Sequence, residues 1–80
     1  MGIIPQVSGA VLCKVLERHG YSIVSQKGSH IKLKLVCKKG THIIIISNHK
    51  TIAKGTLNDI LNKVCLWVDK SKEELIEILK

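Results

Sequence analysis

Residues 30–38 alternate almost strictly between polar and apolar side chains, and this stretch constrains the fold more than any other. The apolar positions are Ile31, Leu33, Leu35 and Cys37, and between them lie His30, Lys32, Lys34, Val36 and Lys38. A period of two is typical of a β-strand that buries one face and exposes the other. The sequence therefore predicts a strand whose exposed face is basic and carries His30.

Short turns flank this strand on both sides. Residues 27–29 join it to an earlier strand that contains Tyr21, Ile23 and Val24, and residues 38–40 lead into a strand over 41–47. Turns this short connect antiparallel neighbours. The last strand has four consecutive isoleucines at its centre, residues 43–46, so both of its faces are apolar there. We expect that strand either to be covered on both faces or to lend one face to a partner.

Three helical patterns surround the strands. Ser8 is suited to cap a first helix, and Gly20 is suited to end it. We expect a second helix to begin near Thr56, with Asp59 completing a short capping box, and a third to begin after Ser71. The predicted fold is α+β, in a single domain over residues 1–80: helix, three-stranded antiparallel sheet, helix and short C-terminal helix. The helices should pack together on the core face of the sheet.

The chain is small and strongly basic. Eighty residues with one Trp, one Tyr and no Phe leave little room for a deep aromatic pocket, so function should lie on an exposed face. The formal net charge of +7 resides in residues 1–65, because residues 66–80 hold three lysines against four carboxylates. Such a field attracts polyanions, above all nucleic acid, and would also attract an acidic protein. A merely solubilising surface is the alternative.

Targeting and metal signals are lacking in the sequence. No apolar run approaches the roughly 18 residues of a membrane span, and the segment 1–6 has no basic stretch before its apolar residues, as a signal peptide would. Gly2 is not followed by the Ser or Thr of a myristoylation motif, since Gln6 stands there. Cys13, Cys37 and Cys65 are too widely spaced for a zinc pair. We expect a cytoplasmic chain with reduced thiols, no metal and no cofactor.

Four histidines are candidates for chemistry. His19 ends the first helix, where its charge suits the helix dipole, and His42 flanks a strand beside a Lys-rich turn, where we expect it to be solvated. His30 begins the central strand and shares a face with two lysines that could hold phosphates on either side of it. His49 follows the third strand, close to where an antiparallel meander returns toward the start of the second. His30 is therefore the first catalytic candidate and His49 the second.

Lys54-Gly55-Thr56 precedes the expected second helix. Free backbone N–H groups and the helix dipole favour an anion there, so these residues together with Lys50 could form a phosphate clamp. The leading glycines of a P-loop are absent. A sharp helix entry without a ligand is the alternative.

Several of these motifs occur together in a fixed order. They are Ser8-Gly9, His19-Gly20-Tyr21, Gln26-Lys27-Gly28-Ser29-His30, His49, and Lys54-Gly55-Thr56-Leu57 with Ile60-Leu61. In this order and spacing the chain resembles the HicA toxins over roughly residues 8–65. Two positions depart from the family pattern: Ser25 stands where many members have a basic residue, and Asn48 where a proline usually precedes the histidine.

The resemblance implies a double-stranded-RNA-binding-domain-like (dsRBD-like) fold and a toxin that cleaves mRNA, neutralised by a HicB-type antitoxin. It places the active-site histidine on His30. The expected mechanism needs no metal, with His30 taking the 2′-OH proton or protonating the leaving 5′-oxygen. The residues expected to contact RNA are Lys27, Gly28, Ser29, Lys32, Lys34, Lys50, Lys54 and Thr56. An oligomer of the chain with itself or with the antitoxin is left open.

Two other functions remain open at the level of sequence. A non-catalytic RNA-binding module would use the same basic surface, since such folds bind RNA largely by shape and backbone contacts. An interaction protein for an acidic partner would use the apolar strand at residues 43–46.

Overall fold

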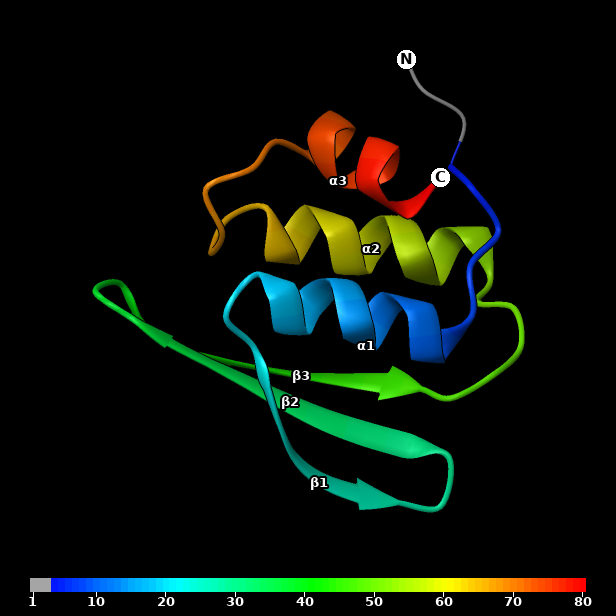
Figure 1. Cartoon of the computed structure of the whole chain (residues 1–80), viewed down its shortest axis with the longest axis horizontal. Helices are drawn as coiled ribbons and strands as arrows, with labels where there is room; N and C mark the ends of the chain where they lie inside the picture. Colours follow the sequence, from blue (N-terminus) through cyan, green and yellow to red (C-terminus); the bar gives the residue numbers. More distant parts are fainter. Residues whose placement is uncertain (1–3) are drawn as a thin grey trace.

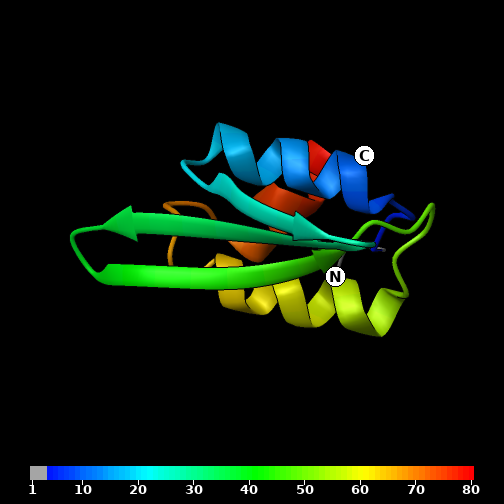
Figure 2. The same cartoon turned by 90° about the horizontal axis from the view of Figure 1, so that it is seen from below.

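The computed structural model describes residues 4–80 and confirms an α+β fold (Figure 1). Its elements, in chain order, are α1 (Gly9–Arg18), β1 (Ser22–Lys27), β2 (His30–Cys37), β3 (Gly40–Ser47), α2 (Lys54–Val64) and α3 (Lys72–Leu79). All three helices lie on one side of the sheet, so within the described residues no helix covers the other face (Figures 1 and 2). Gly2, considered above for myristoylation, lies outside the described residues.

The sheet is an antiparallel meander in the order β1-β2-β3. Lys27 pairs with His30 across the first turn, and Cys37 pairs with Gly40 across the second, so both hairpins close through two-residue turns. Gly28 has a φ of +60°, which the tight hairpin turn requires and which a residue without a Cβ adopts at no steric cost. The predicted turns therefore determine the register of β2 with β3, and that of β1 with β2 as far as the shift between Ile23 and Ser25.

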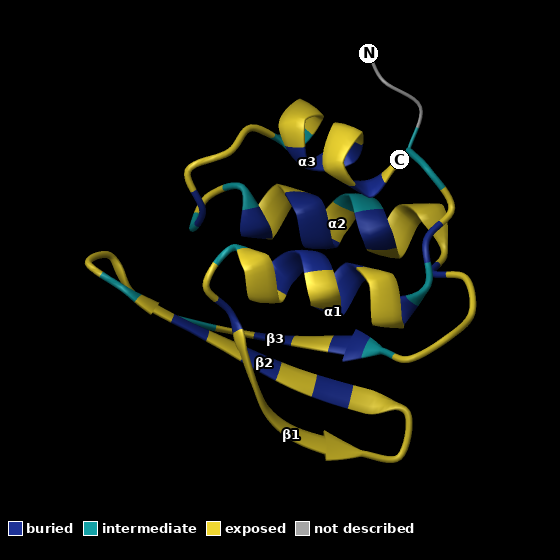
Figure 3. Ribbon diagram, in the orientation of Figure 1, coloured by how far each residue is buried: buried dark blue, intermediate teal, exposed yellow. Residues whose placement is uncertain are grey.

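The alternation along β2 is confirmed. The side chains of Ile31, Leu33 and Leu35 are at most 6% exposed, whereas His30 and the lysines beyond it are exposed (Figure 3). For the chain without a partner, the structure also answers whether β3 is covered on one face or on both. Ile44 and Ile46 are buried, while Ile43 and Ile45 remain 50% and 57% exposed on the uncovered face. β3 is therefore covered on one face only.

The ends of α1 and α3 follow the predicted signals. The hydroxyl of Ser8 accepts a hydrogen bond from the Val11 N–H at 3.1 Å, and Gly20 follows α1 with a φ of +103°. Ser71 and Glu74 form the predicted capping box, with reciprocal hydrogen bonds of 3.1 and 3.2 Å. These polar side chains satisfy backbone groups that would otherwise lack partners at the helix ends.

The capping box expected at the start of α2, from Thr56 to Asp59, is wrong, and the helix begins two residues before the expected start near Thr56. The helix begins at Lys54 after an N-cap at Ala53, and among residues 4–80 no side chain caps it with a hydrogen bond. Leu57 is fully buried, and its N–H bonds to the Ala53 carbonyl at 2.9 Å. That bond extends the helix back over residues 54–56, so Thr56 lies inside the first turn rather than before it.

The core lies in two successive interfaces. α1 and α2 lie over the sheet, and α3 packs against both of them on the side away from the sheet (Figure 1). The largest fully buried side chains come from every layer: Leu12, Leu16, Leu33, Ile46, Leu57, Leu61, Val64 and Leu75. Within residues 4–80, no helix is long and apolar enough to cross a membrane.

Gly9 supplies a test of how closely α1 meets the end of β3. It is buried, its N–H bonds to the His49 carbonyl at 2.9 Å, and an added Cβ would collide with the Ser47 carbonyl and lie 2.9 Å from the Asn48 Cα. Because these atoms are backbone, we expect Gly9→Ala to lower the free energy of unfolding by about 1–3 kcal/mol. Urea denaturation measures this change.

Gly55 is the matched control, since it also lies in the first turn of a helix but an added Cβ there would meet nothing within 4 Å. We expect Gly55→Ala to be neutral or to stabilise the protein by up to about 1 kcal/mol. Equal effects of the two substitutions would contradict the close α1–β3 contact.

Candidate functional site on the open face of the sheet

The uncovered face of the sheet brings several predicted residues together around His30. Residues directly opposite one another in antiparallel strands share a face. His30 is opposite Lys27 on β1 and Ser47 on β3, and Lys32 is opposite Ser25 and Ile45. A depression of about 460 Å³ lies here, and its lining residues are Ser25, Lys27, His30, Lys32 and Ile45.

This face is positively charged without internal compensation. Residues 22–47, which make up the three strands and their turns, contain five lysines and no carboxylate. The ion pairs found within residues 4–80 are Lys70–Glu74 and Lys80–Glu77, at the other end of the chain. An anion that approaches the sheet therefore meets lysine side chains that no carboxylate neutralises, which raises its local concentration.

His30 is exposed at the start of β2 and opens into the depression. Imidazole can accept or donate a proton near neutral pH, and the flanking Lys27 and Lys32 can hold an anionic substrate beside it. The backbone of His30 is fixed by its pairing on both sides, because β2 is the central strand. The arrangement thus combines a solvent-accessible imidazole on a fixed backbone with two adjacent cations.

The other predicted residues near His30 lie around the depression rather than in it. Gly28 and Ser29 form the turn beside it, and the Ser29 carbonyl accepts the Asn48 N–H at 2.6 Å. Lys34 lies further along the same face, opposite Ile43. His49 is exposed just beyond β3 and does not line the depression. Its backbone holds the end of β3 against α1 through the Gly9 N–H.

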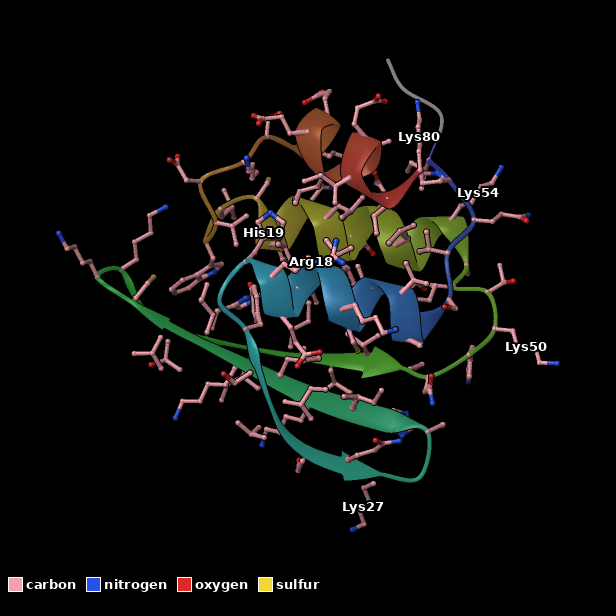
Figure 4. The ribbon with its side chains drawn as sticks, viewed as in Figure 1. Arg18, His19, Lys27, Lys50, Lys54 and Lys80 are labelled. Atoms are coloured by element: carbon pink, nitrogen blue, oxygen red, sulfur yellow. The ribbon has the colours of Figure 1, made fainter. Side chains whose placement is uncertain are left out.

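The residues of the expected phosphate clamp are not gathered around His30. Lys50 lies in the β3–α2 loop and Lys54 in the first turn of α2. Both lie well apart from Lys27, which lies at the end of β1 (Figure 4). Thr56 lines a different groove, between β3 and α2. The structure therefore places a main cluster on the sheet and separate basic positions at the start of α2.

Two residues of the depression, Ser25 and Ile45, were not among the predicted site residues. Their positions follow from counting outward from the two-residue turns, because that register puts both opposite Lys32. Ile45 lies in the apolar run over residues 43–46, which indicated a buried strand or a contact for a protein partner rather than a site for RNA.

The expectation that His42 is solvated is wrong. Its ring stacks on Trp67, with centroids 5.1 Å apart and an interplanar angle of 5°, and its Nδ1 lies 2.7 Å from the Tyr21 hydroxyl. Burial, followed by the positive charge of Lys63, lowers the pKa of His42. Burial also raises the pKa of Tyr21 to about 12, so the phenol keeps its proton and can donate it to a neutral imidazole. His42 is thus a structural histidine.

Fold and site together define a small α+β protein whose open, basic sheet face carries an exposed histidine between lysines. Residues 9–65 match the family model described as HicA toxin of bacterial toxin–antitoxin systems. The chain belongs to this family, which implies an antitoxin partner. No curated protein and no solved structure matches it.

The lowered pKa of His42 has a consequence for stability. In the unfolded chain the His42 imidazole binds a proton near pH 6.5, and in the folded chain it does so only at lower pH. The contribution of His42 to the free energy of unfolding therefore falls as the pH drops below about 6.5. We expect wild type to lose more free energy of unfolding between pH 7.5 and 5.5 than His42→Gln, which has no imidazole to titrate. Urea denaturation at both pH values measures this, and an equal loss in both proteins would contradict the assignment.

Proposed function

We propose that this chain is the toxin of a type II toxin–antitoxin system and acts in the cytoplasm as an endoribonuclease that cleaves mRNA and so blocks translation. The observation that carries the proposal is the position of His30 between Lys27 and Lys32, in an open depression on a basic sheet face. Membership of the HicA family supports it. RNA can reach this face because no helix in the described part of the chain covers it.

RNA binding would be dominated by phosphate contacts. Lys27 and Lys32 border the depression, and Lys34 extends the same row of positive charge along β2. The turn at Gly28-Ser29 lets a backbone approach closely beside His30, because Gly28 has no side chain. Contacts of this kind give affinity and position the strand without reading its sequence.

Cleavage would proceed by attack of the ribose 2′-oxygen on the adjacent phosphorus. His30 either takes the 2′-OH proton or protonates the leaving 5′-oxygen, a step typically worth about 10²- to 10⁴-fold in rate. The P–O5′ bond breaks, leaving a 2′,3′-cyclic phosphate on one fragment and a 5′-OH on the other. The lysines stabilise the charge on the phosphorane, and the proposed step needs no metal.

A complete acid–base pair needs a second group, and His49 is our candidate. It follows β3 directly after the segment that bonds to Ser29, so it lies at the same end of the sheet as His30. Lys50, Lys54 and Thr56 would hold phosphates further along the RNA, at the first turn of α2.

His30→Ala tests the catalytic assignment. We expect the purified variant to bind a single-stranded RNA with wild-type affinity and to cleave it at least about 100-fold more slowly, because only the proton-transfer group is lost. Cleavage by wild type should persist in EDTA and should leave 2′,3′-cyclic phosphate ends. Gel electrophoresis of end-labelled RNA measures rate and ends together.

His19→Ala is the matched control, because it removes a histidine whose ring bonds to the Val15 carbonyl at the far end of α1. It should cleave RNA at the wild-type rate. If wild type binds RNA and never cuts it, the chain is a non-catalytic RNA-binding module instead. Equal rates for wild type and His30→Ala would remove the role given to His30.

Lys32→Ala tests the binding surface. We expect weaker RNA binding and a slope of log affinity against log salt that is reduced by about one, because one phosphate contact and its released counterions are lost. Lys14→Ala is the control, since Lys14 is exposed on α1, on the helical side of the molecule. Fluorescence anisotropy of a labelled RNA between 50 and 200 mM salt measures both slopes, and equal slopes for the two variants would exclude this face.

A further inference from the structure

The outer edge of β3 carries backbone groups with no strand beside them. β3 is the last strand of the sheet, and Cys37 pairs with Gly40 across a two-residue turn. Such a closing pair is hydrogen-bonded, and hydrogen-bonded pairs then alternate along the hairpin. Residues 42, 44 and 46 therefore bond to β2, whereas Thr41, Ile43 and Ile45 direct their N–H and C=O groups outward. Within residues 4–80, no strand faces them.

A groove runs along this edge. It measures about 430 Å³ and lies between the middle of β3 and the flank of α2, which contributes Thr56, Asp59, Ile60 and Lys63. Asp59 and Lys63 are exposed, and neither forms an ion pair within the described part of the chain. The groove thus combines an apolar floor with charged groups that are available to a ligand.

The two edges of the sheet differ in a way that favours β3. The pairing of β1 with β2 is interrupted by a register shift between Ile23 and Ser25, and such a bulge twists an edge and discourages further pairing. β3 pairs without a break from Gly40 to Ser47. Ile43 and Ile45 also remain half exposed beside its free edge. A regular, apolar, unprotected edge is a template for another strand.

A second copy of this chain does not fit this edge. α2 runs alongside β3 and extends beyond it at the rim of the sheet (Figure 2). If two β3 strands paired about a two-fold axis, both α2 helices would fall on the same side of the joined sheet and compete for one space. A single extended strand passes below α2 without this conflict. The net charge of +7 further selects a strand from an acidic protein.

We propose that the β3 edge and its groove are the docking site for an extended, acidic strand of the antitoxin, which adds to the sheet as a fourth strand. Its backbone bonds to Thr41, Ile43 and Ile45, its apolar side chains cover Ile43 and Ile45, and a carboxylate meets Lys63. This docking site rests on family membership and on the open edge, and it does not depend on RNA cleavage.

Charge reversal in the groove tests the site with the chain's own antitoxin as the probe. We expect Lys63→Glu to weaken antitoxin binding at least 10-fold by calorimetry, whereas Lys14→Glu, the same change on the exposed face of α1, weakens it less than 3-fold. Equal weakening by the two variants would indicate only long-range attraction, and no weakening by Lys63→Glu would indicate that the antitoxin does not contact the groove. Either result overturns the proposal. Failure of the wild-type chain to bind the antitoxin also overturns it. Circular dichroism verifies that both variants are folded.

Amide hydrogen exchange locates the contact directly. In the complex, we expect the amides of Thr41, Ile43 and Ile45 to exchange at least 10-fold more slowly than in the free chain, while the amides of residues 42, 44 and 46 serve as internal references. Unchanged exchange at the three edge amides in a formed complex overturns the docking site. The same measurement on His30→Ala should be identical, so loss of the proposed ribonuclease activity and loss of this site are separate outcomes.

Discussion

The burial of one face of β2 beneath the helices is the constraint on which the rest of this structure depends. Ile31, Leu33 and Leu35 point into the helical layer, and each buried side chain of this size contributes about 1.5–3 kcal/mol relative to exposure. Because side chains alternate along a strand, burying these three forces His30, Lys32 and Lys34 onto the opposite face. A slip of one residue would bury the lysines, so the core specifies the register of the site.

All three helices lie on the side of that one face, and their placement leaves the other face of the sheet open. α3 packs on α1 and α2 instead of covering the second side of the sheet, which leaves the β2 lysines hydrated and the outer isoleucines of β3 half exposed. Hydrated lysines retain their charge without a desolvation cost, and unpaired edge groups retain their hydrogen-bonding capacity. A polyanion on the face and a strand at the edge are thus two different ligands for two adjacent surfaces of one sheet.

The sequence was most informative where a residue's role depends on its immediate neighbours. Ser8, Gly20, Ser71 and the glycine turns were recognised because caps and tight turns involve only a few consecutive residues. The start of α2 was misplaced because buried Leu57, through its bond to Ala53, decided it rather than a polar cap. His42 was misjudged for a related reason. Its partners Tyr21 and Trp67 are 21 residues before and 25 residues after it, and no local pattern links them.

By itself, the sequence determined the fold class, the alternation of β2, the two hairpin turns and the family, since each depends on periodicity or on short motifs in order. Hairpin register even places Ile45 and Ser25 opposite Lys32, although the apolar run around Ile45 does not indicate a site for RNA. Only the tertiary structure decided that β3 keeps one face open, that the residues around Lys54 stand apart from His30, and that α2 leaves a groove along the free edge. Those outcomes depend on where helices pack in space, and packing joins residues that are distant along the chain.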